Sequence, residues 1–202
     1  MEDKKLELRV ASLPNPDKPM LQFYGIMDLD GINSSLTSVS LKSCWDLSID
    51  WDSCFANRLA PYYDFWALRH KTWSPNDYWK QRQFLMDNGI SKYDANIATI
   101  WFRMIRIDRQ AQPIKVDSAF GGLGIHKKNI LKNCKYIGVD KKGNEICEHI
   151  HLNRQLNDRG FNLYVVPSFI NCSWNEHNYH LKYNKKIEAK ICNNFKKLRN
   201  ET

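Results

Sequence analysis

The amino-acid sequence predicts an α/β fold in which a mixed β-sheet is flanked by helices. Short apolar runs alternate along the chain with stretches of helical periodicity, which favours layers of both kinds of element. The length of 202 residues fits one domain, and 43% hydrophobic residues provide enough apolar side chains for one core. We therefore expect a single domain over residues 1–202.

Strands are expected where apolar or β-branched residues cluster between turn-forming residues. The first should be a buried strand that ends just before Asp28. The last should stop at Pro167, because proline cannot donate a hydrogen bond to a strand ladder. We expect strands over residues 20–27, 52–56, 62–69, 114–116, 123–125 and 161–166.

Helices are expected where apolar residues recur every three or four positions after a capping residue. Ser74 followed by Pro75 is a typical helix start, and Asn88 followed by Gly89 is a typical end. We expect helices over residues 75–88, 93–107, 148–159 and, with a strongly basic composition, 185–202. Residues 1–19, which contain three prolines, should form an N-terminal extension or loop.

The sequence shows no membrane or export signal. No stretch approaches the roughly 18 uncharged apolar residues of a membrane-spanning helix. The N-terminus is charged and lacks the apolar run of a signal peptide. The six cysteines form no C-x-x-C pair and lie scattered through the chain, which favours reduced thiols over a zinc site. We expect a soluble, cytoplasmic protein, while the even cysteine count leaves disulfides open as the alternative.

The net charge of +8 lies entirely in the last third of the chain. Residues 1–125 hold 15 basic and 15 acidic residues, whereas residues 126–202 hold 15 basic and 7 acidic residues. Such a basic segment can attract polyanions, acidic lipid headgroups or phosphates, or it can be a solvated helix. Because the sequence carries no helix-turn-helix, zinc-finger or RNA-recognition signature, we expect no nucleic-acid partner.

Asp28 and Asp30 form the first candidate site. They follow a predicted buried strand, which is where open α/β sheets place their ligands. Side chains at positions i and i+2 of an extended backbone point to the same side, so the two carboxylates could share a divalent ion. A turn capped by an aspartate is the structural alternative.

Two further segments carry candidate residues. Gly121 and Gly122 permit positive φ angles and close approach of a ligand, or they form a plain turn. Glu148 opens a predicted helix, where its charge favours the helix dipole, and it could also serve as a general base. His149 would be a neighbour of that base.

Aromatic and histidine residues complete the candidates. In the string Tyr62 to Arg69, aromatic faces such as Trp66 could stack on a sugar or base, and Asp64 and Arg69 could bind hydroxyls or phosphates. The alternative is a core strand with a buried ion pair. His177 or His180 could complete a metal shell, or both could lie in a polar loop.

Five of these features in this order resemble GT-A-type glycosyltransferases of bacteria and large DNA viruses. The resemblance covers roughly residues 20–180 and depends most on the aromatic string and the glycine pair. The five features are Asp28-Leu-Asp30, Tyr62-Tyr-Asp-Phe-Trp-Ala-Leu-Arg69, Ser118-Ala-Phe-Gly-Gly-Leu123, Cys147-Glu-His149, and Asn162-Leu-Tyr-Val-Val-Pro167 followed by a histidine.

The resemblance implies a GT-A-like fold and a transferase that moves a sugar from a UDP- or GDP-sugar to a hydroxyl group of a glycan, lipid-linked or protein acceptor. It implies that Asp28, Asp30 and His177 hold Mn²⁺ or Mg²⁺ together with the donor diphosphate. His180 is the alternative third ligand, and Glu148 is the candidate catalytic base.

The resemblance also assigns residues that bind the donor or acceptor. Gly121 and Gly122 would lie near the donor sugar and the acceptor. Asp64, Trp66, Arg69 and His149 would contribute polar and aromatic contacts there.

One departure from the family pattern affects these expectations. Only 27 residues precede Asp28, whereas the family builds its nucleotide pocket from several elements before that point. The sheet is therefore expected to lack the first strands of the nucleotide-binding half. A non-catalytic or truncated remnant of the fold, and a basic polyanion-binding protein, are the alternatives to an active enzyme.

Overall fold

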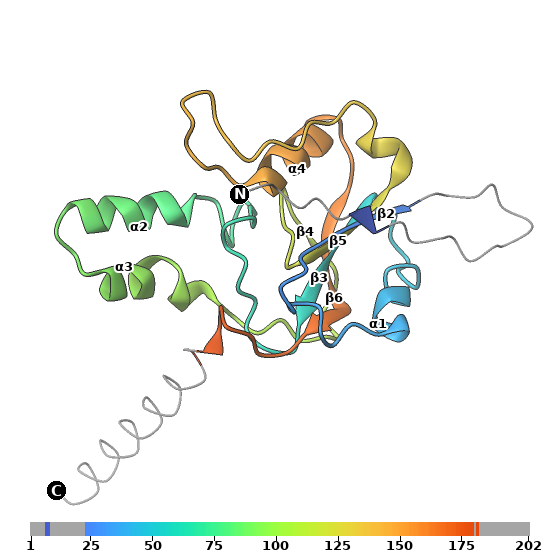
Figure 1. Ribbon diagram of the computed structural model, residues 1–202. Helices are drawn as coiled ribbons and strands as arrows, with labels where there is room; N and C mark the ends of the chain where they lie inside the picture. Colours follow the sequence, from blue (N-terminus) through green and yellow to red (C-terminus); the bar gives the residue numbers. More distant parts are fainter. Residues whose placement is uncertain (1–6, 9–22, 180, 182–202) are drawn as a thin grey trace, which may run out of the picture.

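A computed structural model describes residues 7–8, 23–179 and 181 of the chain (Figure 1). A mixed β-sheet with helices packed against it confirms the predicted α/β class. The strands are β1 (Glu7–Leu8), β2 (Phe23–Met27), β3 (Ser53–Arg58), β4 (Ile114–Lys115), β5 (Leu123–Lys127) and β6 (Leu163–Cys172). The α-helices are α1 (Ser38–Lys42), α2 (Tyr78–Asp87), α3 (Lys92–Thr99) and α4 (Glu148–Asp158), and the 3-10 helices are η1 (Trp101–Arg103) and η2 (Lys128–Leu131).

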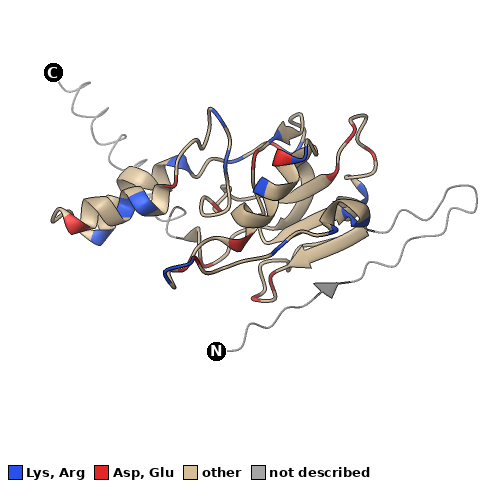
Figure 2. Ribbon diagram, turned by 90° about the horizontal axis from the view of Figure 1, so that it is seen from above, with Lys and Arg blue, Asp and Glu red and all other residues tan. Residues whose placement is uncertain are grey.

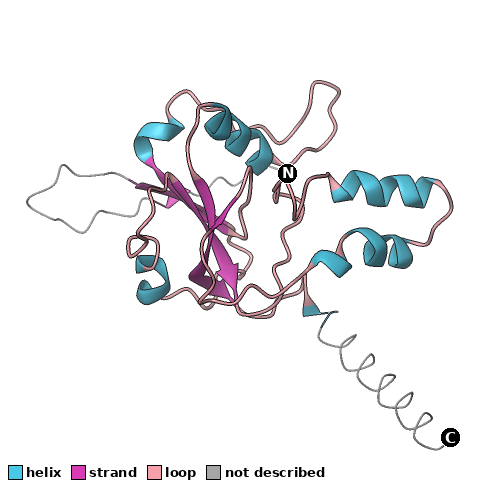
Figure 3. Ribbon diagram, turned by 180° about the vertical axis from the view of Figure 1, so that it is seen from behind, coloured by secondary structure: helices cyan, strands magenta, loops and turns pink. Residues whose placement is uncertain are grey.

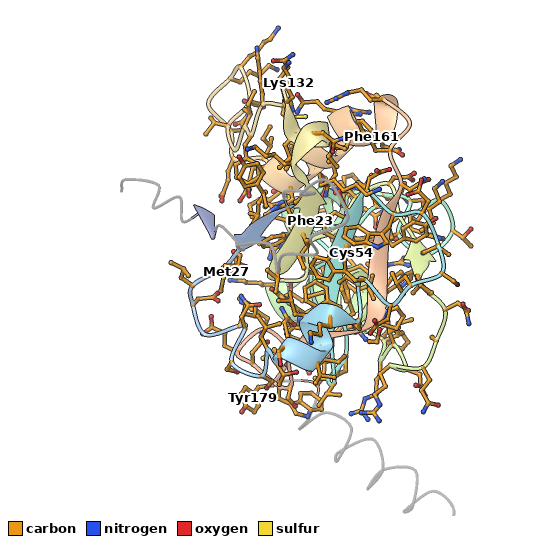
Figure 4. All side chains as sticks on the ribbon, turned by 90° about the vertical axis from the view of Figure 1, so that its right-hand side faces the viewer. Phe23, Met27, Cys54, Lys132, Phe161 and Tyr179 are labelled. Carbon is orange, nitrogen blue, oxygen red and sulfur yellow. The ribbon has the colours of Figure 1, made fainter. Side chains whose placement is uncertain are left out.

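Three strands finish at the same end of the sheet. Its order is β1-β2-β5-β3-β6-β4, with β5 antiparallel to both β2 and β3, and with β3 parallel to β6. The C-terminal ends of β2, β3 and β6 therefore lie at the same end of the sheet, where β5 begins. Figure 4 shows Met27 and Tyr179 toward this end and Phe161, which precedes β6, toward the other. Ligands of α/β sheets bind at such an edge.

The central strand β3 is buried along its whole length and separates two apolar clusters. Phe55 packs on one face, together with Leu156 of α4. Cys54 and Ala56 point to the other face and pack with Ile125 of β5. This alternation follows from the period of two in a strand. Each fully buried large apolar side chain contributes about 1.5–3 kcal/mol to the free energy of unfolding.

Helices α2 and α3 form a hairpin that projects from the sheet (Figure 3). α2 begins after Asp77, whose carboxylate accepts hydrogen bonds from two backbone N–H groups of the first turn. The predicted cap, Ser74, lies outside the helix, and its hydroxyl donates to the Leu68 carbonyl at 3.0 Å. The second predicted helix, 93–107, is shorter than expected, because α3 ends at Thr99 and only η1 follows.

The strand predicted over residues 62–69 is wrong. Only residues 65–67 form a turn, in which the Asp64 carboxylate accepts the Ala67 N–H at 3.1 Å, and strand-like pairing in this segment is limited to an isolated bridge between Arg69 and Ser118. Arg69 Nη1 donates to three carbonyl groups of the same segment, those of residues 65, 66 and 68. Side-chain hydrogen bonds thus replace the strand ladder that the aromatic composition favours.

The predicted stop of the last strand at Pro167 is also wrong. β6 continues to Cys172, and its pairing with β3 shifts register after Val165 and resumes at Ile170. Pro167 lies inside this irregularity, where no ladder donor is required of it. Its carbonyl group accepts a hydrogen bond from the Asn57 side chain at 2.9 Å.

Some predicted features fall partly or wholly outside the described residues. The basic helix 185–202 and His180 lie outside them. Within the segment 1–19, expected as a loop, Glu7 and Leu8 form β1, which pairs with β2. No helix of the described part is long and apolar enough to cross a membrane. The described cysteines are all free thiols.

His126 makes the stability of this fold sensitive to acid. Its side chain is buried in β5, and Nδ1 lies 2.8 Å from the Ser53 hydroxyl. Burial lowers the pKa of His126 from 6.5 to about 4. The unfolded chain therefore binds a proton at a higher pH than the folded chain does. The free energy of unfolding should fall as the pH drops below about 6.5, by about 3 kcal/mol at pH 4 from this group.

Urea unfolding of wild type and His126→Gln at pH 7 and pH 4 tests this prediction. Glutamine offers Ser53 a polar partner but does not titrate. The variant should lose about 3 kcal/mol less stability than wild type between the two pH values. Equal losses in both proteins would contradict the assignment.

Candidate functional site

The candidate site lies at the end of the sheet where β2, β3 and β6 finish. Asp28 follows β2, Arg58 ends β3, and His177 lies beyond the end of β6. Gly121 and Gly122 immediately precede β5 at the same edge. The topology thus brings together segments that are far apart in the sequence.

The glycine pair is required by the packing of the protein itself. Gly121 has a φ angle of 69° and Gly122 one of 87°, a region that favours glycine. A Cβ atom at Gly121 would collide with the carbonyl oxygen of Ala56, and one at Gly122 would collide with the Ile32 side chain. The close approach expected for a ligand is therefore made by β3 and by the loop after β2.

Two asparagines fasten the Asp28 loop to this glycine turn. The Asp28 N–H donates to the Gly122 carbonyl at 3.0 Å. Asn33 Nδ2 donates to the carbonyl groups of Asp28 and Gly122 at 2.9 and 3.0 Å. Asn171 Nδ2 donates to Asn33 Oδ1 and to the Gly121 carbonyl, both at 2.8 Å. Local sequence pattern predicts neither role, because the glycine turn lies 89 positions from Asn33 and 50 from Asn171.

Asp64 faces the same turn from the other side. Its Oδ2 accepts the Gly121 N–H at 2.9 Å, so this carboxylate also supports the backbone. Burial raises the pKa of Asp64, and its backbone hydrogen bonds and the nearby Arg58 partly oppose that rise. Arg58 is itself buried and stacks 3.8 Å above the Tyr63 ring, which in turn stacks on His177.

Asp28 sits among like charges. Its pKa is raised to about 7, first by burial and then by the carboxylates of Asp30, Asp64 and Glu148. Three other acidic side chains therefore lie within electrostatic reach of Asp28. Such crowding disfavours their simultaneous ionisation unless a cation compensates. A raised carboxyl pKa at a strand end is typical of functional sites.

Asp30, Glu176 and His177 form a group that could hold a metal ion. One ligand atom from each lies within 4.8 Å of the others, and all three side chains are exposed. One oxygen of Asp30 also accepts the Ile32 N–H at 3.2 Å, as in an aspartate-capped turn. Asp30 and His177 are thus brought together as expected. Asp28 is not part of this trio, and Glu176, which had not been singled out, takes its place.

Glu148 lies at the start of α4, as expected. The Tyr136 hydroxyl donates to Glu148 Oε1 at 3.5 Å and lies 3.1 Å from His149 Nδ1. The His149 ring stacks on Phe120 at 3.5 Å, and burial lowers the pKa of His149 to about 3. His149 is therefore a neutral, packed ring beside Glu148, and its role as a ligand-binding residue stays a prediction.

Trp66 and Arg69 lie beside two hollows in the surface. Trp66 lines both, the smaller of about 360 Å³ together with Asp64 and His177, and the larger of about 710 Å³. Arg69 lines the larger hollow, but its guanidinium donates hydrogen bonds to backbone carbonyls and lies 3.5 Å from the Asp77 carboxylate. Arg69 thus has a structural role, and Trp66 forms part of the wall of both hollows.

The glycine turn gives a test of the site's construction. Gly121→Ala should lower the free energy of unfolding by about 3 kcal/mol or more, because positive φ and a backbone collision both oppose a side chain. Gly143→Ala is the matched control, since Gly143 has a φ angle of 82° and open space around it. The control should cost only about 1–2 kcal/mol. Equal costs in urea unfolding would show that the turn is not confined by β3.

Comparisons with known proteins leave the site to be interpreted from its own chemistry. No protein-family model, curated protein or solved structure matches this chain.

Proposed function

We propose that the chain is a metal-dependent glycosyltransferase of the GT-A type that uses a nucleoside-diphosphate sugar. The observation that carries the proposal is a group of possible metal ligands, Asp30, Glu176 and His177, beside a hollow with aromatic walls that His177 also lines. The order of the sequence motifs and the mixed sheet are in keeping with it. An acidic cluster next to a hollow of this size suits a ligand that brings both a cation and an anionic group.

The chain's own residues fit a divalent cation such as Mn²⁺ or Mg²⁺. Asp30, Glu176 and His177 would hold it, since their ligand atoms already lie within 4.8 Å of one another. A bound cation would also favour the ionised form of Asp28, whose pKa is raised by burial among carboxylates. A bound ion would supply charge stabilisation for a diphosphate leaving group.

The smaller hollow suits the ring of a donor. Trp66, Trp79 and Trp101 line it together with Tyr63 and Arg82. Aromatic faces stack on sugars and nucleobases. Because Asp64 and His177 line the same hollow, a ligand there would lie next to the carboxylates.

Glu148 is proposed as the general base. It is close enough to Asp28 to raise the pKa of that residue, so it belongs to the same acidic cluster. Tyr136 and His149 lie against it, at 3.5 and 3.7 Å, and can fix the direction of its carboxylate. In the proposed reaction Glu148 accepts the proton of the acceptor hydroxyl.

Isothermal titration tests the cation and donor sites in turn. Mn²⁺ is titrated into the metal-free chain first, and UDP and GDP are then titrated with and without Mn²⁺. We expect Mn²⁺ to bind, and one nucleotide to bind at least tenfold more tightly in its presence. Asp30→Asn should abolish both effects, because it removes a ligand charge. Asp158→Asn, an exposed acidic residue at the far end of α4, is the control and should change neither.

The base is tested in the same protein. Glu148→Gln should keep Mn²⁺ and nucleotide binding and lower sugar transfer, or release of UDP from UDP-sugars, by at least about 100-fold. Mn²⁺ binding without any nucleotide binding would contradict the transferase proposal and favour a non-catalytic form of the fold. Unchanged Mn²⁺ binding in Asp30→Asn would contradict the cation site.

A further inference from the structure

The larger hollow, of about 710 Å³, lies between α2 and the start of α4. It shares Trp66, Trp79 and Arg82 with the smaller hollow, so the two are neighbours on the surface. Cys147, the residue before Glu148, lines its wall. A ligand in the larger hollow would therefore lie beside the proposed donor pocket and near the start of α4, the helix that carries the proposed base.

The larger hollow is basic. Four cationic side chains line it, against two carboxylates, which leaves a net charge of +2. The four are Arg69, Lys80, Arg82 and Arg154, and the two are Asp77 and Glu145. Figure 2 shows basic residues along the projecting hairpin that supplies one wall of the hollow.

Two of the arginines are not matched by carboxylates. Asp77 lies 3.5 Å from Arg69 and 4.0 Å from Lys80. Within the part of the chain that the structure describes, no carboxylate lies within 4.0 Å of Arg82 or Arg154. The free positive charge of the hollow therefore comes from opposite walls, α2 and α4.

The α2 wall also carries polar atoms without partners. The Arg82 guanidinium stacks 4.2 Å above the Trp79 ring. Arg82 Nε and Trp79 Nε1 are buried and make no hydrogen bond among the described residues. Buried donors are normally paired, so these two are unusual. Both atoms are closed to solvent, and a ligand would meet the remainder of the Arg82 side chain, which lines the hollow. Trp66 and Trp79 meet edge to face at 6.3 Å and provide the aromatic surface that stacks on sugar rings.

From these observations we propose that the larger hollow binds a sugar phosphate as the acceptor substrate. Arg82 and Arg154 bind its phosphate oxygens, and the tryptophans contact the sugar ring. This inference rests on the proposed glycosyltransferase function. In the transfer, the acceptor hydroxyl oxygen forms a bond to the donor's anomeric carbon. The bond from that carbon to the diphosphate breaks, the nucleoside diphosphate leaves with the bonding electrons, and Glu148 takes the hydroxyl proton.

Calorimetric titration of glucose 1-phosphate and of glucose into the full chain, in EDTA, tests the proposal. We expect glucose 1-phosphate to bind at least tenfold more tightly than glucose, and its affinity to fall with added salt. Arg154→Gln, at an exposed position, and Arg82→Gln should each weaken its binding about tenfold. Arg109→Gln, an exposed arginine outside the hollow, is the control and should have no effect.

A further arm distinguishes the two sources of a sugar phosphate. A sugar joined through diphosphate to a ten-carbon alkyl chain should bind at least tenfold more tightly than glucose 1-phosphate if the acceptor is lipid-linked, and equally if it is a soluble sugar phosphate. Both results support the proposal.

Equal binding of glucose and glucose 1-phosphate would overturn it, as would full binding in both arginine variants. Because EDTA removes divalent ions, failure here is separate from failure of the Mn²⁺ and nucleotide titrations.

Discussion

The close passage of Gly121 and Gly122 against Ala56 and Ile32 is the constraint on which the rest of the site depends. One amide of this turn donates to Asp64, and one carbonyl accepts the Asp28 N–H. Two carboxylates from separate parts of the chain are thereby held on either side of a single turn. If the turn carried side chains, β3 and the loop after β2 would have to separate, and the acidic cluster would open.

Holding this cluster together has an electrostatic cost. Burial and neighbouring carboxylates raise the pKa of Asp28 to about 7, and Asp64 is perturbed in the same direction. Arg58 offsets part of the negative charge, although it is buried, and burial lowers its own pKa. Charges packed in this way destabilise a fold, and they are typical of sites that bind a cation or transfer a proton.

The pattern of the sequence was sufficient for the elements that carry a clear periodicity. The strands that became β2, β3 and β5 and helix α4 were found close to their expected places. The segment 62–69 was not, because its hydrogen bonds come from the side chains of Asp64 and Arg69, which strand propensity ignores. The predicted end of the last strand at Pro167 is wrong for a similar reason. A register shift in the pairing of β6 with β3 means that no backbone donor is needed at this proline.

The candidate site was predictable only in part. Asp30 and His177 were expected to meet, and they do. Asn33 and Asn171 could not be found from local pattern, because their contacts join residues up to 138 positions apart. Glu176 adjoins His177 in the sequence, yet nothing in its type or spacing set it apart from other surface acids. The burial of Arg58 could not be predicted either, because Arg58 ends an apolar strand and a buried charge is not expected there.

Paramagnetic broadening by Mn²⁺ in the amide NMR spectrum tests the position of the proposed cation site most directly. Substoichiometric Mn²⁺ should broaden the signals of Gly31, Ile32 and His177, which surround Asp30 and Glu176, and should leave Gly143 and Gly160 sharp. Broadening centred instead on another acidic pair, such as Asp50 and Asp52 beside Lys127, or no localised broadening at all, would contradict a cation site at the end of β2.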